Sequence, residues 1–331
     1  MVNDMKFSII IPVQKINDYI INFIPKLLEQ DYPKFEIFIL PDVIPKEIPK
    51  ILKNKNIKII ETGKMGPAKK RDFGAKKSKG DILAFIDDDA YPTDKKWLEK
   101  VSENFKDTEI TAVGGPQLTP KESNFFQKLS GKLFESPMIS GPVNFRHKSA
   151  KKRICYDLPS CNFFIRKKDF FDAGGFDTGF WPGEDTKLCL NIKKLNKKIV
   201  YAPNIKVYHH RRKNLREYIK QNVTYAIHRG FFVKKYPETS FKIAYFIPSL
   251  FLIGIILGYF LAFFSSFLAK IYVFALVFYF LLMFIEGVKT KKISYIFPFI
   301  IIGFITHIIY GTGFIKGLTK KNLKSKYRKE S

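Results

Sequence analysis

Three consecutive aspartates directly follow an apolar run in the stretch GDILAFIDDDAYP, residues 80–92. Adjacent carboxylates repel one another, and a bound cation relieves that repulsion. Carboxylate oxygens suit Mg²⁺ or Mn²⁺, which commonly bind through one or two carboxylates together with substrate phosphates. Side chains alternate along an extended chain, so we expect Asp87 and Asp89 to share one side and Asp88 to face elsewhere. A solvated acidic turn that closes a strand is the alternative interpretation.

A second pair of carboxylates, Glu184 and Asp185, follows the glycine- and aromatic-rich stretch GGFDTGFWPG. Asp185, Leu188 and Ile192 have helical spacing, which places the two acids at the start of a helix. The helix dipole favours the ionised form of a carboxylate at that end. Such a group is either a plain helix cap or a general base that deprotonates an acceptor hydroxyl. Spacing alone supports the two roles equally.

Strand-like and helix-like segments alternate through the first 86 residues. The expected strands are 6–13, 35–40, 57–62 and 81–86, and the expected helical segments are 18–33, 45–54 and 66–80. This alternation predicts an α/β fold with βαβ units and a mixed, mostly parallel sheet flanked by helices. Ligands bind beyond the carboxyl ends of the strands in such sheets, which is where the three aspartates lie.

The chain is strongly basic, with 57 Lys and Arg residues against 30 Asp and Glu. That excess indicates an anionic partner: nucleic acid, an acidic membrane surface or a phosphorylated substrate. The hydrophobic fraction of 46% excludes a disordered basic protein. Cys155, Cys161 and Cys189 lack C-x-x-C spacing, so we expect reduced thiols in a cytosolic domain rather than disulfides or a zinc site. The N-terminal stretch has too short an apolar run for a signal peptide.

Composition changes near residue 241. Residues 241–285 contain only two charged side chains, Lys242 and Lys270, and are long enough for two membrane-crossing helices joined at Ser265 and Ser266. Helices in soluble cores rarely stay apolar on every face for that length, which argues against a buried soluble hairpin.

A third apolar segment, residues 293–315, is interrupted by Pro298, His307 and three glycines. If the N-terminal half is cytosolic, two crossings return the chain to the cytosol at the lysines of EGVKTKK, in agreement with the positive-inside rule. A third crossing would export a strongly basic tail. The third segment is therefore re-entrant or interfacial, or the tail is an exception to the rule, and the sequence leaves both alternatives open.

The segment that precedes the apolar region has apolar residues at every fourth position: Leu215, Ile219, Val223 and Ile227. This pattern is typical of an amphipathic helix at an anionic membrane surface, or of an ordinary surface helix. The predicted organisation is a catalytic domain (1–212), an amphipathic linker helix (213–240), a membrane region of two or three helices (241–315) and a basic tail (316–331).

Five short motifs between about residues 6 and 212 resemble the family 2 glycosyltransferases. In chain order they are SIIIPV, RDFGAKKSKGDILAFIDDDA, CNFFIRKKDFFDAGGFD, GEDTKL and VYHHRR. Each motif alone has low specificity, but five motifs in the family's order are specific. The resemblance implies the GT-A fold and an inverting transferase that uses a nucleotide-diphosphate sugar and Mg²⁺ or Mn²⁺.

The resemblance also implies roles by position. Asp87 and Asp89 would hold the metal and the sugar nucleotide, Asp185 would be the catalytic base, and Glu184 would stand beside it. The metal shell would be completed by His209 or His210. The donor side would include Pro12, Asp42, Arg71 and Asp88, and the acceptor side Asn162 and Trp181.

The sequence departs from the family pattern in three places. At the end of the second strand, the sequence has LPDVIP where the family usually has an acidic pair followed by Gly-Ser. Asp72 stands where the family usually has Asn. The stretch QNVTYAIHRG lacks the Trp of the Q-x-x-R-W signature of processive synthases. The last departure indicates the transfer of one sugar rather than polymerisation.

The expected protein is a multi-pass enzyme of the cell membrane whose catalytic domain faces the cytoplasm. Its acceptor would be lipid-linked or a glycan of the cell envelope, and its other partners are membrane lipids. Two alternatives stay open. A metal-dependent nucleotidyltransferase would also use these carboxylates, but it needs no second carboxylate on an acceptor side. A basic membrane-bound nucleic-acid-binding protein fits the charge, yet the signature residues are acidic and no nucleic-acid motif is recognised, so nucleic acid is not an expected partner.

Overall fold

The computed structural model describes residues 5–176 and 179–323, and its contacts divide the chain into two compact units. Within the described residues, the first unit joins the chain up to Pro120 with Lys148–His210. The second joins Lys121–His147 with Arg211–Leu323. The boundary predicted at residue 212 lies close to the junction between His210 and Arg211, but the sequence pattern does not foresee that Lys121–His147 belongs to the second unit.

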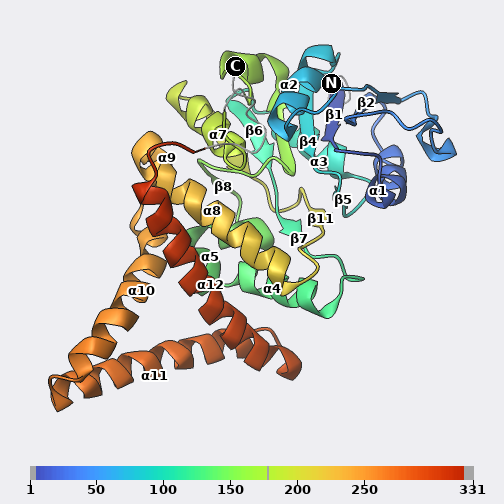
Figure 1. Cartoon of the computed structure of the whole chain (residues 1–331). Helices are drawn as coiled ribbons and strands as arrows, with labels where there is room; N and C mark the ends of the chain where they lie inside the picture. The colour runs from blue at the N-terminus through green and yellow to red at the C-terminus, as the bar shows by residue number, and fades with distance from the viewer. Residues whose placement is uncertain (1–4, 177–178, 324–331) are drawn as a thin grey trace. The chain divides into compact units, whose positions relative to one another are not determined.

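The first unit is built on an eight-stranded mixed sheet with the order β3-β2-β1-β4-β9-β6-β10-β8 (Figure 1). β1 runs parallel to both β2 and β4, and β9 is antiparallel to β4 and β6. The strands are β1 (Phe7–Pro12), β2 (Phe35–Leu40), β3 (Ile57–Ile59), β4 (Ile82–Ile86), β6 (Ile110–Gly114), β8 (Arg153–Ile154), β9 (Asn162–Arg166) and β10 (Lys198–Tyr201). The predicted α/β architecture and its four N-terminal strands are thus confirmed.

The central strands β1, β2 and β4 are buried at every position. Their sequences are nearly continuous apolar runs, as expected for parallel strands covered on both faces. Ser8 and Glu36 are the polar exceptions: the Ser8 hydroxyl donates to Glu36 Oε1 at 2.8 Å, and Lys58 donates to Glu36 Oε2 at 2.7 Å.

The helices of the first unit flank this sheet. They are α1 (Asp18–Leu28), α2 (Pro67–Lys77), α3 (Trp97–Asn104), α6 (Lys167–Asp172) and α7 (Glu184–Lys194). Asn17 caps α1 by accepting a hydrogen bond from the Ile20 amide at 3.0 Å. The helical segment predicted at 45–54 shrinks to one 3-10 turn, Lys50–Leu52, because Pro49 interrupts it and fixes the backbone just before the turn.

A separate three-stranded sheet has the order β5-β11-β7, formed by Ala90–Pro92, Val207–His209 and Gln117–Leu118. β5 directly follows the turn that the three aspartates form, and Ala90 pairs with His209. The small sheet therefore brings the end of β11 beside the aspartates at the carboxyl end of β4.

The second unit is helical. It contains α4 (Phe125–Glu135), α5 (Pro137–Ser140), the 3-10 segment η2 (Gly141–His147), α8 (Leu215–Lys235), α9 (Pro237–Ser240), α10 (Ile243–Ala262), α11 (Ser266–Val288) and α12 (Ile293–Thr319). The last three are each long and apolar enough to cross a membrane. The third helix ends at Thr319, four residues later than predicted. In Figure 1, α10 and α12 run from the two ends of α11 toward α8.

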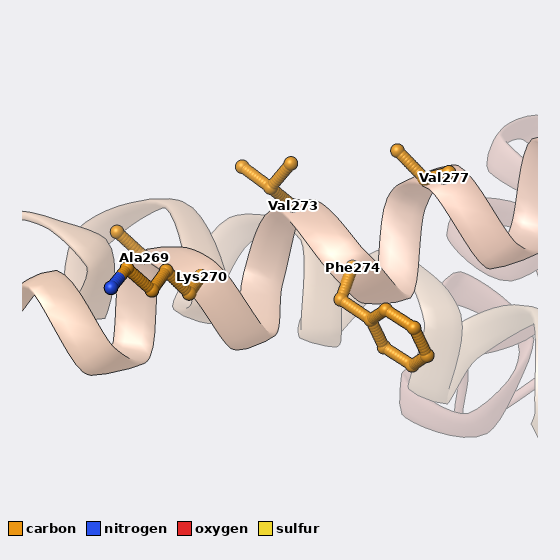
Figure 2. A pocket seen from close by; sticks show the side chains of 5 residues that line it. All are labelled: Ala269, Lys270, Val273, Phe274 and Val277. Carbon is orange, nitrogen blue, oxygen red and sulfur yellow. The ribbon is translucent and has the colours of Figure 1, made fainter.

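α11 presents an apolar face to its surroundings. Figure 2 shows Val273 and Val277 on one side of the helix and Phe274 on another, beside a shallow hollow that Ala269 and Lys270 also line. Lys270 lies in the second turn, near the hairpin with α10, where a long side chain can carry its charge toward the water interface.

The face of α8 that the protein covers is not the one with regularly spaced apolar residues, and the contact of that apolar face with a membrane surface stays a prediction. The residues with four-residue spacing, Leu215, Ile219, Val223 and Ile227, are exposed or half-buried. Instead, the residues buried along the length of α8 include Tyr218, Asn222, Ala226 and Gly230. Small side chains on this face allow α12 to approach closely, so close packing rather than apolar surface decides which face is covered.

Candidate active site

Asp87, Asp89 and His209 form a cluster that could hold a metal ion. Each offers one ligand atom, and these atoms all lie within 4.8 Å of one another. The side chains are 29%, 20% and 19% exposed, so a ligand can reach them from solvent. Two carboxylates and an imidazole are donors that Mg²⁺ and Mn²⁺ accept, and the turn that follows β4 brings Asp87 and Asp89 together.

His209 is oriented by a partner on its far side. Its Nδ1 lies 2.8 Å from Gln117 Oε1, and its Nε2 lies 3.1 Å from Asp89 Oδ1. Because an amide oxygen can only accept, Nδ1 carries the proton and Nε2 faces the carboxylates, as in many metal-ligating histidines. Burial by itself lowers the pKa of His209, but Asp89 and Cys161 outweigh it and raise the pKa to about 10.

His210 does not join this cluster. Its ring lies 5.4 Å from the Phe23 ring at an interplanar angle of 13°, and 5.0 Å from the ring of Tyr19. Its backbone amide donates to the Asp89 carbonyl oxygen at 3.0 Å. Successive side chains at a strand end point to opposite sides, so of the two predicted histidines only His209 reaches the aspartates.

Asp88 points away from the pair, as predicted. Its Oδ2 accepts a hydrogen bond from Asn17 Nδ2 at 2.6 Å, at the N-terminus of α1. Burial raises the pKa of Asp88 to about 6, with a further rise from Asp89 and an opposing effect of the Asn17 hydrogen bond. Asp88 therefore anchors the acidic turn to α1, and a direct contact with the donor stays a prediction.

Arg71 connects the two groups of carboxylates. One guanidinium nitrogen donates to Asp87 Oδ1 at 2.6 Å and another to Glu184 Oε1 at 3.0 Å. The side chain is buried, and its guanidinium lies 5.5 Å from the centre of the Phe176 ring. The sequence pattern suggested that Arg71 positions a nucleotide. In the structure Arg71 bonds two protein carboxylates and so fixes their positions, and a contact with a nucleotide stays a prediction.

Glu184 and Asp185 begin α7, after Gly183 in a left-handed conformation with φ of 118°. Glu184 is 4% exposed, and burial raises its pKa to about 7, with Asp185 adding to the rise and Arg71 opposing it. Asp185 is only half-buried, and its Oδ1 accepts a hydrogen bond from the Thr186 amide at 2.8 Å. Of the two acids, Asp185 is the one that an acceptor can reach.

Two predicted donor residues lie at neighbouring strand ends. Pro12 ends β1 and pairs with Leu40, which ends β2, and Asp42 follows two residues later. Lys70 donates to Asp42 Oδ1 at 2.5 Å and also to the carbonyl oxygens of Val13 and Leu40. Lys70 is 2% exposed, and no sequence pattern singles it out because other lysines of the same helix are exposed.

Asn162 has a structural role rather than the predicted acceptor contact. Its side chain is 1% exposed, its Nδ2 donates to the Ile205 carbonyl oxygen at 2.9 Å, and its Oδ1 accepts from Trp97 Nε1 at 3.3 Å. The amide thus joins β9 to α3 and to the chain before β11. Trp181, in contrast, is 36% exposed two residues before Gly183, so a contact with an acceptor stays a prediction.

Asp72, the residue that departs from the family's Asn, holds the loop before α7. Its Oδ1 accepts a hydrogen bond from the Phe176 amide at 2.8 Å. The preceding Gly174 and Gly175 have φ of 82° and 64°, which side chains adopt rarely. A carboxylate performs this role as well as an amide oxygen.

Comparison with known proteins decides the family. Residues 8–172 match the model of glycosyl transferase family 2. The dolichyl N-acetyl-alpha-D-glucosaminyl phosphate 3-beta-D-2,3-diacetamido-2,3-dideoxy-beta-D-glucuronosyltransferase of Methanococcus voltae is 27% identical over 95% of this chain and 98% of its own length. The chain is a family 2 glycosyltransferase. Its activity is glycosyl transfer, and these matches favour neither nucleotidyl transfer nor nucleic-acid binding.

Other relatives of this glycosyltransferase match in part or in fold. A pre-mycofactocin glycosyltransferase of Mycobacterium tuberculosis is 26% identical over 49% of the chain, which spans a third (33%) of that relative. A mannosyltransferase from Pyrobaculum calidifontis, solved with GDP-Man and Mn²⁺, superposes with a TM-score of 0.65 at 14% identity, covering 96% of this chain and 88% of its own. At that identity the likeness establishes the GT-A fold alone. The family model ends at residue 172, so it does not include the acids at the start of α7.

Proposed function

We propose that this glycosyltransferase inverts the anomeric carbon of a nucleotide-diphosphate sugar while moving one sugar to a hydroxyl of a lipid-linked acceptor. The observation that carries the proposal is the double contact of Arg71. Arg71 bonds Asp87 and Glu184 at the same time. It thereby connects the acidic cluster after β4 with the N-terminus of α7, where Asp185 lies. The donor side and the acceptor side of a transferase are thereby held at one site.

On the donor side, Asp87, Asp89 and His209 would hold Mg²⁺ or Mn²⁺, and the fit of their donor atoms supports this assignment. A bound divalent ion neutralises the charge that develops on a diphosphate leaving group. Gln117 keeps the proton on Nδ1 of His209, so that Nε2 can face a cation. Lys70 holds Asp42 at the ends of β1 and β2, where the nucleotide would lie.

On the acceptor side, Asp185 would remove the proton from the attacking hydroxyl. Its position at the N-terminus of α7 favours the ionised form, which a base requires. Glu184 lies against Arg71 and acts as a positioning residue, because its carboxylate is buried away from solvent. The hydroxyl attacks from the face opposite the leaving group, which inverts the anomeric carbon.

The acceptor class rests on the Methanococcus voltae relative, whose name gives a dolichyl phosphate-linked sugar as acceptor and which matches this chain over nearly its whole length. Three long apolar helices fit membrane association and would keep the enzyme where such a lipid resides. We extend this to a protein whose α10–α11 hairpin crosses the cell membrane and whose catalytic unit faces the cytoplasm. The transfer assay below identifies the sugar and the nucleotide, and it separates a lipid-linked acceptor from a purely glycan acceptor.

The test is sugar transfer by the purified full chain in detergent with Mn²⁺. A panel of radiolabelled nucleotide-diphosphate sugars is offered with a polyprenyl phosphate-linked N-acetylglucosamine, with polyprenyl phosphate, and with the free sugar. The proposal expects transfer to the first acceptor, dependence on Mn²⁺ or Mg²⁺, and a product of inverted anomeric configuration. Transfer that persists undiminished in excess EDTA, or a product of retained configuration, contradicts it.

A further inference from the structure

We infer that α12 lies along the membrane surface instead of crossing the bilayer, so that both of its ends stay on one side. By length and composition α12 could cross, as α10 and α11 could. However, 33% of its most apolar window is buried inside the protein, compared with 6% for α10 and 11% for α11. The elements that bury α12 determine where it can lie.

The midpoint of α12 is hydrogen-bonded to two other segments of the second unit. Thr306 Oγ1 lies 2.9 Å from Tyr218 Oη of α8, and His307 Nε2 lies 2.9 Å from the Met138 carbonyl oxygen of α5. A crossing helix has its midpoint near the centre of the hydrocarbon. Crossing would therefore carry Tyr218, and the chain around it, to that depth.

The chain around Tyr218 is charged and exposed. Arg216, Glu217 and Lys220 all face outward, and with Asn214 they line a hollow of about 350 Å³. Charged side chains at the bilayer centre are costly and occur there when they pair or line a water-filled cavity. A helix with this surface belongs in water or among lipid headgroups, and α12 is held beside it.

α8 and α12 cannot be separated without losing a close backbone contact. A Cβ added at Gly317 would lie 2.2 Å from the Ile227 carbonyl oxygen, and one added at Gly230 would lie 2.1 Å from the Phe314 carbonyl oxygen. Contacts therefore continue from the midpoint of α12 to its last turn. Small residues at these positions are what allow two helix backbones to approach so closely.

The N-terminal half of α12 packs on α4 through large apolar side chains. Tyr295 and Phe299 share a buried cluster with Leu129 and Leu133, while α4 also carries Lys128, Lys132 and Glu135. The opposite side of this half exposes Ile293, Phe297 and Ile301. One face on charged helices and one bare apolar face is the geometry of a helix that lies in the membrane interface.

Lysines at both ends of α12 fit a partner made of anionic lipid headgroups. Lys291 and Lys292 precede the helix, and Lys316, Lys320 and Lys321 lie in or after its last turn. Basic residues gather on the cytoplasmic side of a membrane, where they are attracted to anionic lipids. With α12 at the surface, both lysine groups lie on one side, and the basic tail is not exported.

The test compares two added cysteines, Lys292→Cys and Lys321→Cys, in sealed membrane vesicles of a single orientation. A membrane-impermeant maleimide is applied before and after the vesicles are permeabilised. Lys213→Cys, at the start of α8, marks the side of the polar helices. The native cysteines Cys155, Cys161 and Cys189 are buried, so maleimide labelling of the parent protein measures the background signal.

The inference expects Lys292→Cys and Lys321→Cys to behave alike and to follow Lys213→Cys: all three label in sealed vesicles, or all three only after permeabilisation. It is overturned if one end of α12 labels in sealed vesicles while the other needs permeabilisation. A second pair, Ser294→Cys with Asn322→Cys, repeats the comparison where a lysine variant does not accumulate.

Discussion

The acids after β4 and the acids at the start of α7 are the same chemical groups in different surroundings. Asp87 and Asp89 are partly exposed and lie beside a histidine, whereas Glu184 is buried and Asp185 is half-buried at a helix N-terminus. One arginine touches a member of each group. The comparison teaches that solvent access and the neighbouring cation, rather than residue type, distinguish the carboxylates, and the proposed roles in metal binding, proton transfer and positioning follow that difference.

The largest expected effect is on the acceptor side. Asp185→Asn removes the proposed base, so the rate of transfer should fall about 10²–10⁴-fold. Donor affinity, measured by calorimetry with Mn²⁺, should stay unchanged because the proposed donor contacts lie in the other group. Glu109→Gln, at an exposed acid of the same unit, is the control and should keep the normal rate. Normal transfer by Asp185→Asn would remove this residue from the mechanism.

The next effect is on stability and tests the link between the two groups. Arg71→Met leaves the carboxylates of Asp87 and Glu184 without their shared cation. The expected cost is about 3–5 kcal/mol, seen as a fall in Tm of roughly 6–20 °C. Arg166→Met is the matched control, because Arg166 donates to the backbone carbonyl oxygens of Ile110 and Phe105, and its loss should cost about 1–3 kcal/mol. Equal falls in Tm for the two variants would show that the contacts of Arg71 with Asp87 and Glu184 add no more stability than ordinary hydrogen bonds.

Within the acidic turn, two neighbouring aspartates should respond differently to the same change. Asp89→Asn should weaken Mn²⁺ binding in the presence of a nucleoside diphosphate by about 10–100-fold or more, the loss caused even by outer-shell changes at metal sites. Asp88→Asn should change it little, because Asp88 bonds Asn17 instead. Isothermal titration of both variants gives the comparison, and a larger loss in Asp88→Asn would reverse the assignment.

The smallest effect is a pH dependence. The pKa of Glu184 is raised in the folded chain from 4.5 to about 7, chiefly by burial. The folded state thus binds the proton more tightly than the unfolded state, so this stabilisation is complete below about pH 4.5 and is lost as pH rises toward 7. Glu184→Gln should flatten the fall of Tm across that window. An unchanged slope would mean that Glu184 does not titrate there.

Much of the catalytic sheet was predictable because its information is local. Continuous apolar runs predicted β1, β2 and β4, and the three consecutive acids marked the turn that follows β4. What the sequence could not show are contacts between distant segments. Glu184 lies 113 positions after its partner Arg71, and Gln117 is a single polar residue of a two-residue strand. Neither helical nor strand periodicity in the sequence indicates such pairs.

In the second unit, too, the sequence pattern does not show contacts between distant segments. Hydropathy located the apolar region of α10, α11 and α12, but it did not show which face of α8 packs against α12. The face that is covered contains Asn222, Ala226 and Gly230, which have little apolar surface. Their value is the close approach they allow to Gly313 and Gly317 of a helix about 90 residues later. That complementarity is visible only once both helices are placed.

The most direct test of the central claim asks which residue of the pair His209 and His210 contacts a bound metal. Pulsed electron paramagnetic resonance of Mn²⁺ with a nucleoside diphosphate detects a directly coordinated imidazole nitrogen. We predict this nitrogen signal in the parent protein and in His210→Ala, and its loss in His209→Ala. A signal that persists in His209→Ala, or one that disappears only in His210→Ala, would contradict the assignment of Asp87, Asp89 and His209 as the metal site.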